Sequence, residues 1–188
     1  MFISKKKYFL YLNDYLDFDL NLIKIKNKFS VIYNGNIKKD KVKTLKLLRR
    51  KCKEKHILFY VSNNLKLANN CMADGLYISS YNKKKYPKSR RNFRIIGSAH
   101  NFKEIFEKQK QGCNEIILSR LLRTDYKEKK GYLGVSRFNL ISRFLDINLV
   151  PLGGIRLNNI NKLKTVNSRS FMIMSEVKKK PAIISRLF

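Results

Sequence analysis

The chain alternates short apolar runs with segments of helical spacing, and this alternation limits its fold more than any other feature. The runs are four to six residues long, rich in β-branched and aromatic side chains, and bounded by polar or glycine-containing stretches, as buried strands are. Eight occur, at Tyr8–Asn13, Phe29–Tyr33, Ile57–Ser62, Gly75–Ser79, Phe93–Gly97, Glu115–Ser119, Leu149–Leu152 and Ser170–Met174. Their apolar residues do not alternate cleanly with polar ones, which is typical of parallel strands covered on both faces.

Between most of these runs, apolar residues recur at the spacing of an α-helix. The segments contain Val42, Leu45, Leu48 and Cys52; Phe102, Ile105 and Phe106; Val135, Phe138, Ile141 and Leu145; and Leu157, Ile160 and Leu163. Asn101, with Glu104 three residues later, predicts a capped helix start. The stretch Tyr81–Asn92 has the weakest helical pattern, and we expect an irregular loop there.

Eight strands with intervening helices predict an α/β fold, the (β/α)8 TIM barrel, formed by one domain over residues 1–188. The length lies below the ~200–250 residues usual for this fold, so we expect a compact barrel with some shortened helices. The alternative is an open doubly wound sheet, which needs fewer strands and usually a glycine-rich first turn. The chain contains no GxGxxG motif.

The chain is strongly basic, with 42 Lys and Arg against 13 Asp and Glu and a net charge of +29. Such a charge attracts nucleic acid or anionic lipid. The basic residues come in short scattered runs, and the chain is rich in Lys, Asn, Ile, Phe and Tyr and lacks Trp, a bias typical of A/T-rich codons. We therefore favour a compositional origin of the charge over dedicated nucleic-acid binding, which stays open as an alternative.

The sequence favours a cytoplasmic protein without a membrane partner. No apolar run approaches the ~20 residues of a membrane-spanning helix. The first apolar stretch, Tyr8–Leu12, is cut off by polar residues and is followed by no small-residue cleavage site. Cys52, Cys71 and Cys113 form no close pair, so we expect neither a disulfide framework nor a cysteine metal site.

In a TIM barrel the active site lies at the carboxyl ends of the strands. The residues at those positions are small and polar and include few carboxylates, which suits an anion better than a metal ion. Gly153 and Gly154 follow the seventh run, and Ser175 follows the eighth, just ahead of a helical stretch. Backbone N–H groups at a glycine pair, with a serine at a helix start, form a cradle for phosphate. We predict a phosphate site here in preference to a simple tight turn.

Five segments in register resemble the family of thiamine phosphate synthases and their TenI relatives. They are Ala73–Ile78, Ile95–His100, Gly112–Lys127, Val150–Ile155 and Met172–Ser175. In the third of them a Gly-Cys-Asn turn leads into a strand and then to Thr124 and Lys127, like the family's Gly-Ala-Asp turn, strand, Thr and Lys. The resemblance covers residues 57 to 177 and, more loosely, the chain from Tyr8 onward.

The resemblance implies a TIM barrel that binds a phosphorylated small molecule, thiazole phosphate. In the synthases this substrate is joined to a pyrimidine methyl diphosphate, whose diphosphate is held by Mg²⁺ and leaves as pyrophosphate. By position, the resemblance implies that Gly153, Gly154 and Ser175 hold a substrate phosphate, that Thr124 and Lys127 contact phosphate or diphosphate, and that Ser98 neighbours the reacting centre. The oligomeric state is not predicted.

The chain departs from the family pattern at several positions. Asn63 and Asn82 stand where the synthases carry Mg²⁺-binding aspartates, and amides are poorer Mg²⁺ ligands than carboxylates. The family's Gln-x-Arg-x-Lys segment has no counterpart near Val31–Gly35. No cofactor is therefore predicted with certainty, and Mg²⁺ is expected only if the chain retains the diphosphate reaction.

Some TenI members tautomerise a thiazole carboxylate phosphate, with a proton-shuttling histidine after the sixth strand. This chain has Arg120 there, and an arginine cannot act as a base near neutral pH. His100 is the remaining candidate for a general base, although a histidine after a strand is more often a turn or cap residue. Three interpretations stay open: a synthase-like transferase, a thiazole tautomerase, and a barrel without catalysis that binds nucleic acid.

Overall fold

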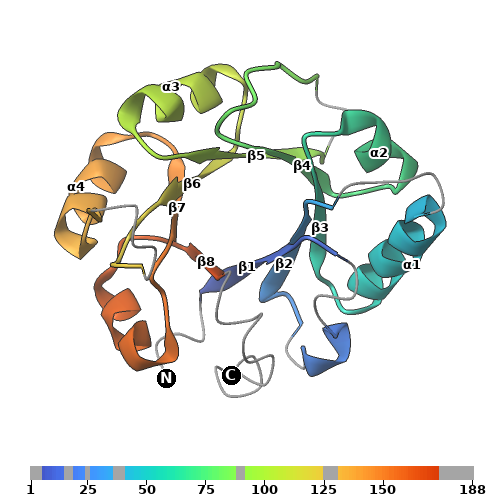
Figure 1. The fold of residues 1–188 in the computed structure, drawn as a ribbon, viewed down its shortest axis with the longest axis horizontal. Helices are drawn as coiled ribbons and strands as arrows, with labels where there is room; N and C mark the ends of the chain where they lie inside the picture. The colour runs from blue at the N-terminus through green and yellow to red at the C-terminus, as the bar shows by residue number, and fades with distance from the viewer. Residues whose placement is uncertain are drawn as a thin grey trace.

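The computed structural model describes residues 6–14, 19–23, 26–35, 41–87, 92–124 and 131–173. Its eight strands are parallel and close into a barrel in chain order, with β1 pairing both β2 and β8 (Figure 1). The strands are β1 (Lys7–Leu12), β2 (Phe29–Tyr33), β3 (Leu58–Ser62), β4 (Gly75–Ile78), β5 (Arg94–Ala99), β6 (Glu115–Ser119), β7 (Asn148–Leu152) and β8 (Ser170–Ile173). The predicted TIM barrel is confirmed, and the closed sheet excludes the open doubly wound alternative. That residues 1–188 form one domain stays a prediction.

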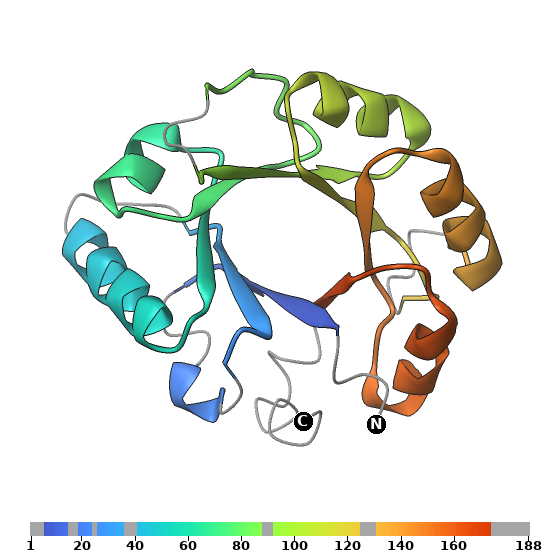
Figure 2. The ribbon, with the colours of Figure 1, turned by 180° about the vertical axis from the view of Figure 1, so that it is seen from behind.

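Helices surround the barrel on its outside (Figures 1 and 2). They are α1 (Lys41–Glu54), α2 (Leu65–Asn70), α3 (Phe102–Lys110) and α4 (Val135–Phe144), with two 3-10 helices, η2 (Leu20–Leu22) and η3 (Leu157–Thr165). The expected shortening is confirmed, since α2 has six residues and η2 has three. The described part of Tyr81–Asn92 contains no helix, in agreement with the predicted loop.

The helical segment at Leu157–Thr165 is a 3-10 helix, whereas the apolar spacing predicted an α-helix. Asn159 caps the start of this helix, because its side chain bonds to the backbone of two residues that precede it. Its Oδ1 accepts from the N–H of Arg156 at 2.8 Å, and its Nδ2 donates to the carbonyl of Gly154 at 2.7 Å. These bonds satisfy backbone groups that come before the first helical turn.

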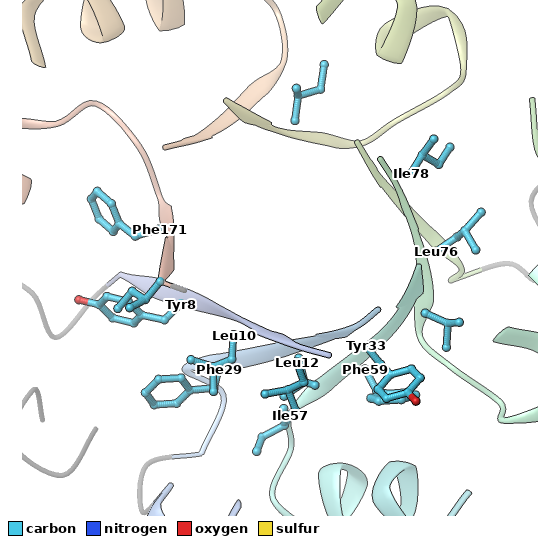
Figure 3. Close-up of a cluster of buried hydrophobic side chains, with 14 of the residues drawn as sticks. Tyr8, Leu10, Leu12, Phe29, Tyr33, Ile57, Phe59, Leu76, Ile78 and Phe171 are labelled. Atoms are coloured by element: carbon cyan, nitrogen blue, oxygen red, sulfur yellow. The ribbon is translucent and has the colours of Figure 1, made fainter. Parts of the chain in front are cut away.

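Strand alternation sorts the apolar side chains into an inner and an outer layer. The inner cluster takes one residue from each strand, namely Phe9, Ile32, Tyr60, Tyr77, Ile96, Ile117, Val150 and Met172. The outer cluster packs between strands and helices, and includes Leu10, Phe59, Leu76 and Phe171 (Figure 3). The barrel is therefore filled at mid-height, and chemistry is confined to its two ends.

Asp74 and Asn114 each tie the start of a strand to the preceding strand, β4 to β3 and β6 to β5, by the same pair of hydrogen bonds. Asp74 accepts from the N–H of Phe59 through Oδ2 at 2.8 Å, and its own N–H donates to the carbonyl of Phe59. Asn114 makes the same pair of bonds with Ile95. Asp74 is also 2.6 Å from Nη2 of Arg49, which links α1 to the start of β4. Both motif residues are thus structural clamps at the end of the barrel where strands begin.

Helix α3 begins as predicted and carries a buried lysine. Oδ1 of Asn101 accepts from the N–H of Glu104 at 2.9 Å. Lys108 is 0% exposed, and its Nζ donates to the carbonyl of Asn82 at 2.7 Å and to Oε1 of Gln111 at 2.9 Å. Burial lowers the pKa of Lys108. This ammonium group ties the loop after β4 to α3.

None of the helices within the described ranges combines the length and apolar character needed to cross a membrane.

Helix α4 offers a direct test of the outer layer, because it carries one buried and one exposed phenylalanine. Phe138 is 0% exposed and Phe144 is 80% exposed. We expect Phe138→Ala to lower the free energy of unfolding by about 3–5 kcal/mol, since it leaves a cavity against the barrel. The control Phe144→Ala should change it by less than about 0.5 kcal/mol. Urea unfolding curves measure both, and equal effects of the two variants would contradict the packing of α4.

Candidate functional site

The carboxyl ends of the parallel strands gather at one end of the barrel, and we call this end, formed by the residues that complete or follow each strand, the mouth. The structure places eight of the predicted residues there. They are Asn63, Asn82, Ser98, His100, Arg120, Thr124, Gly153 and Gly154. Lys127 and Ser175 lie outside the described residues, so their roles stay predictions. Six of them fall into two corners of the mouth, and Ser98 and His100 lie between these corners, at and just after the end of β5.

The loops after β6 and β7 form one corner and are bonded backbone to backbone. Leu121 donates its N–H to the carbonyl of Leu152 at 2.8 Å, and Leu122 donates to the carbonyl of Gly153 at 3.0 Å. A Cβ atom on Gly154 would lie 2.5 Å from the carbonyl oxygens of Leu122 and Arg123. Only a residue without a side chain permits this approach, so the glycine pair positions the loop that leads to Thr124.

Gly153 and Gly154 both have positive φ values, 101° and 70°, which glycine adopts without steric cost. Within the described ranges, no acceptor takes a hydrogen bond from the N–H of either residue. Oγ1 of Thr124 is buried and likewise has no hydrogen-bond partner among the described residues. Arg120 packs its side-chain stem against Gly153. Buried polar groups are normally paired, so this corner offers donors that suit an anion.

The loops after β3 and β4 form the second corner, where the two predicted amides meet. Nδ2 of Asn82 donates to Oδ1 of Asn63 at 2.9 Å. The same oxygen accepts from the N–H of Ser79 at 3.0 Å and from the Ser79 hydroxyl at 3.2 Å. Oδ1 of Asn82 accepts from the N–H of Lys84, and Nδ2 of Asn82 also donates to the hydroxyl of Tyr86 at 2.9 Å. We call the Asn63–Asn82 contact the amide pair.

The amide pair does not fit a bound Mg²⁺. Both carboxamide oxygens already accept hydrogen bonds, and neither carries the negative charge that attracts this cation. No group of three or more His, Cys, Asp or Glu residues with metal-ligand geometry occurs in the part of the chain that the structure describes. The chemistry of this corner therefore has to be derived without a metal ion.

Tyr11 and Tyr77 lie toward the mouth, and the sequence did not lead us to predict these two residues there. The rings of Tyr11 and Tyr77 meet edge to face, with centroids 5.9 Å apart. Burial raises the pKa of Tyr77, and a hydrogen bond with Ser98 partly offsets this. Burial also raises the pKa of Tyr11, as do the nearby hydroxyls of Tyr77 and Tyr81. The phenols of Tyr11 and Tyr77 are therefore neutral at pH 7. Side chains alternate along a strand, so Tyr11, two residues after the inward-facing Phe9, also points into the barrel. This alternation was the sequence signal that could have identified the two tyrosines.

His100 lies at the start of α3, and its contacts are those of a cap residue. Its Nδ1 is 3.0 Å from Oε2 of Glu104, and its backbone N–H donates to the same oxygen at 2.8 Å. Burial alone would raise the pKa of Glu104, but the bonds from His100 and Asn101 outweigh it and lower this pKa. A catalytic role of His100 stays a prediction, and its ring is engaged in the cap.

Comparison with known proteins agrees with the fold and the motifs. A family model described as thiamine monophosphate synthase matches residues 5–177. A thiamine-phosphate synthase of Prochlorococcus marinus subsp. pastoris is 31% identical over 140 residues, which are 73% of this chain and 40% of that protein. A thiamine-phosphate synthase of Flavobacterium psychrophilum is 30% identical over 135 residues, 66% of this chain and 65% of that protein. The chain thus spans about two fifths of the length of the Prochlorococcus marinus relatives.

Among solved structures, a thiamine phosphate pyrophosphorylase from Pyrococcus furiosus superposes with a TM-score of 0.68. The superposition covers 99% of this chain and 96% of that one at 18% sequence identity, which shows a shared fold. The match to the family model is a match of sequence, and it runs from before β1 to beyond β8. The chain therefore belongs to the thiamine monophosphate synthase family.

Proposed function

We propose that this chain works in thiamine biosynthesis, in the cytoplasm, as a synthase-like transferase that binds thiazole phosphate at the β6–β7 corner of the mouth. The observation that carries the proposal is the set of unpaired donors at this corner. These are the N–H groups of Gly153 and Gly154 and the hydroxyl of Thr124, none of which has a partner within the described residues. A phosphate group would supply the acceptors that this corner lacks.

The second step of the proposal concerns the coupling reaction. A diphosphate leaving group gains negative charge as its bond to the pyrimidine methylene breaks, and fixed donors and cations around it lower the barrier. Arg120, and by the family resemblance Lys127, supply positive charge after β6. Ser98 is at the end of β5, beside the neutral hydroxyl of Tyr77. In this proposal the thiazole nitrogen attacks the methylene carbon, and pyrophosphate departs with the electron pair of the broken bond.

We rank thiazole tautomerisation below coupling. Tautomerisation needs a group that takes up a proton and returns it at another atom. Arg120 stands at the position that the resemblance assigns to this group, and its guanidinium stays protonated. The ring of His100 is held by Glu104 at the start of α3.

Thr124→Val tests the proposed phosphate site without disturbing the fold. Valine keeps the shape of threonine and removes a buried hydroxyl that has no partner among the described residues, so stability should stay unchanged or rise slightly. Affinity for thiazole phosphate should fall about tenfold or more, because hydrogen bonds to charged groups contribute ~1.5–3 kcal/mol. Calorimetric titration measures both proteins, with the unphosphorylated thiazole alcohol as the ligand control.

Thr165→Val is the matched control variant, since Thr165 is exposed and its hydroxyl donates to the carbonyl of Lys162 near the end of η3. Its affinity for thiazole phosphate should equal that of the unaltered chain. The proposal fails if thiazole phosphate does not bind the unaltered chain, or if Thr124→Val binds it equally well.

The amide pair predicts that the β3–β4 corner does not bind Mg²⁺. Calorimetric titration of the unaltered chain with Mg²⁺ should give no saturable heat. Chelation with EDTA should leave thiazole phosphate affinity unchanged. In Asn63→Asp/Asn82→Asp two carboxylates replace the amides, and we expect Mg²⁺ affinity to rise about tenfold or more. Saturable Mg²⁺ binding to the unaltered chain that Asn63→Ala abolishes would show that the amide pair is a metal site after all.

A further inference from the structure

The end of the barrel opposite the mouth contains two hollows, and both are lined by cations. We call this end, where strands begin with Lys7, Arg94, Glu115 and Asn148, the strand-start pole. The first hollow has a volume of about 580 Å³ and lies between the later part of α1 and the chain that leads into β4 and β5. The second has a volume of about 860 Å³ and lies at the starts of β1, β5, β6, β7 and β8, beside η3.

Nine basic side chains line these hollows, and two carboxylates accompany them. The basic residues are Lys46, Arg49, Arg50 and Lys53 in the first hollow, and Lys6, Lys7, Arg94, Lys164 and Arg169 in the second. Asp74 is bound by Arg49 and by the backbone of Phe59. Glu115 has Arg94, Lys7 and Asn148 as its charged and hydrogen-bonding neighbours. Arg50 also pairs with Glu54 at 3.3 Å, so the nine cations exceed the three nearby carboxylates, Asp74, Glu115 and Glu54, by six.

Part of this positive charge is free to meet a ligand. Lys46, Lys53 and Lys164 are exposed, and none of them has an ion-pair partner within the described residues. On α1, the spacing from Lys46 through Arg50 to Lys53 makes a row about 10 Å long on one face of the helix. Such a row is longer than a single phosphate group and suits successive phosphates of a chain.

Consecutive residues at the start of β5 line the two hollows, with Asn92 and Phe93 in the first and Arg94 in the second. Basic residues therefore line both hollows of the pole, from α1 in the first to η3 in the second. An exposed aromatic ring lies at the same end, since α4 finishes at Phe144 and β7 begins at Asn148, a lining residue of the second hollow. With 80% of its surface exposed, Phe144 packs little within the chain.

We propose that the strand-start pole binds a single-stranded polynucleotide. A basic track beside exposed aromatic rings is how proteins bind single strands without sequence preference, with cations along the phosphates and bases stacked on the rings. A compact phosphate ligand would leave most of the track unused, and a duplex would have no free base to stack on Phe144. This site is separate from the mouth and independent of the function proposed there.

Fluorescence anisotropy with labelled 20-mers of U and of dT tests the proposal, and a 20-base-pair duplex serves as competitor. The pole variant is Lys46→Glu/Lys53→Glu/Lys164→Glu. Its control, Lys66→Glu/Lys103→Glu/Arg137→Glu, makes the same change of net charge at exposed positions in the first turns of α2, α3 and α4, on the mouth side. Each phosphate contact contributes ~0.7 to the slope of log K against log salt for single strands. We therefore expect the pole variant to lower this slope by about 2 and the control variant by less than about 0.7.

Phe144→Ala and Phe106→Ala form a second matched pair, since Phe106 is also exposed but lies within α3. Loss of stacking should weaken binding of the 20-mers about fivefold or more in Phe144→Ala and leave it unchanged in Phe106→Ala. Thiazole phosphate affinity should be unchanged in the pole variant, in Phe144→Ala and in Phe106→Ala. The inference is overturned if neither single strand binds at about 150 mM salt, or if the duplex binds as tightly as both single strands. It is also overturned if both triple variants lower the slope of log K against log salt by the same amount, or if Phe144→Ala binds the 20-mers as tightly as the unaltered chain.

Discussion

In a closed barrel of eight parallel strands, each strand turns its side chains alternately toward the inside and the outside of the cylinder. In this chain, each strand supplies one apolar residue to the inner layer, and that layer fills the barrel at mid-height. Parallel direction also brings all carboxyl ends to one face and all strand starts to the other. The two ends are therefore separate surfaces, and each can carry its own chemistry.

The two ends differ in how they present positive charge. The β6–β7 corner of the mouth uses backbone N–H groups and the hydroxyl of Thr124, which do not titrate near neutral pH. The β3–β4 corner is closed by the amide pair, whose oxygens already have donors. The strand-start pole instead relies on nine basic side chains around two hollows. Binding at the mouth should be specific for an end group of defined shape, whereas binding at the pole should depend strongly on salt.

The barrel could be predicted from the sequence because its strands are continuous apolar runs, and their number left few alternatives. The start of α3 could be predicted because Asn101 and Glu104 make a local capping pattern. Helix α2 was missed because six residues are too few to show helical periodicity. The contact between Asn63 and Asn82 could not be predicted, since it joins two loops that come together only when the barrel closes. Lys108 was missed for a related reason, because an ammonium group is buried only where loop carbonyls from elsewhere in the chain accept its protons.

The central claim is that backbone donors at the end of β7 hold the phosphate of the ligand. A crystal structure of the chain with thiazole phosphate tests it most directly. The account predicts phosphate oxygens within hydrogen-bond distance of the N–H groups of Gly153 and Gly154 and of the hydroxyl of Thr124. A phosphate bound away from this corner, at the amide pair or at the strand-start pole, would contradict it.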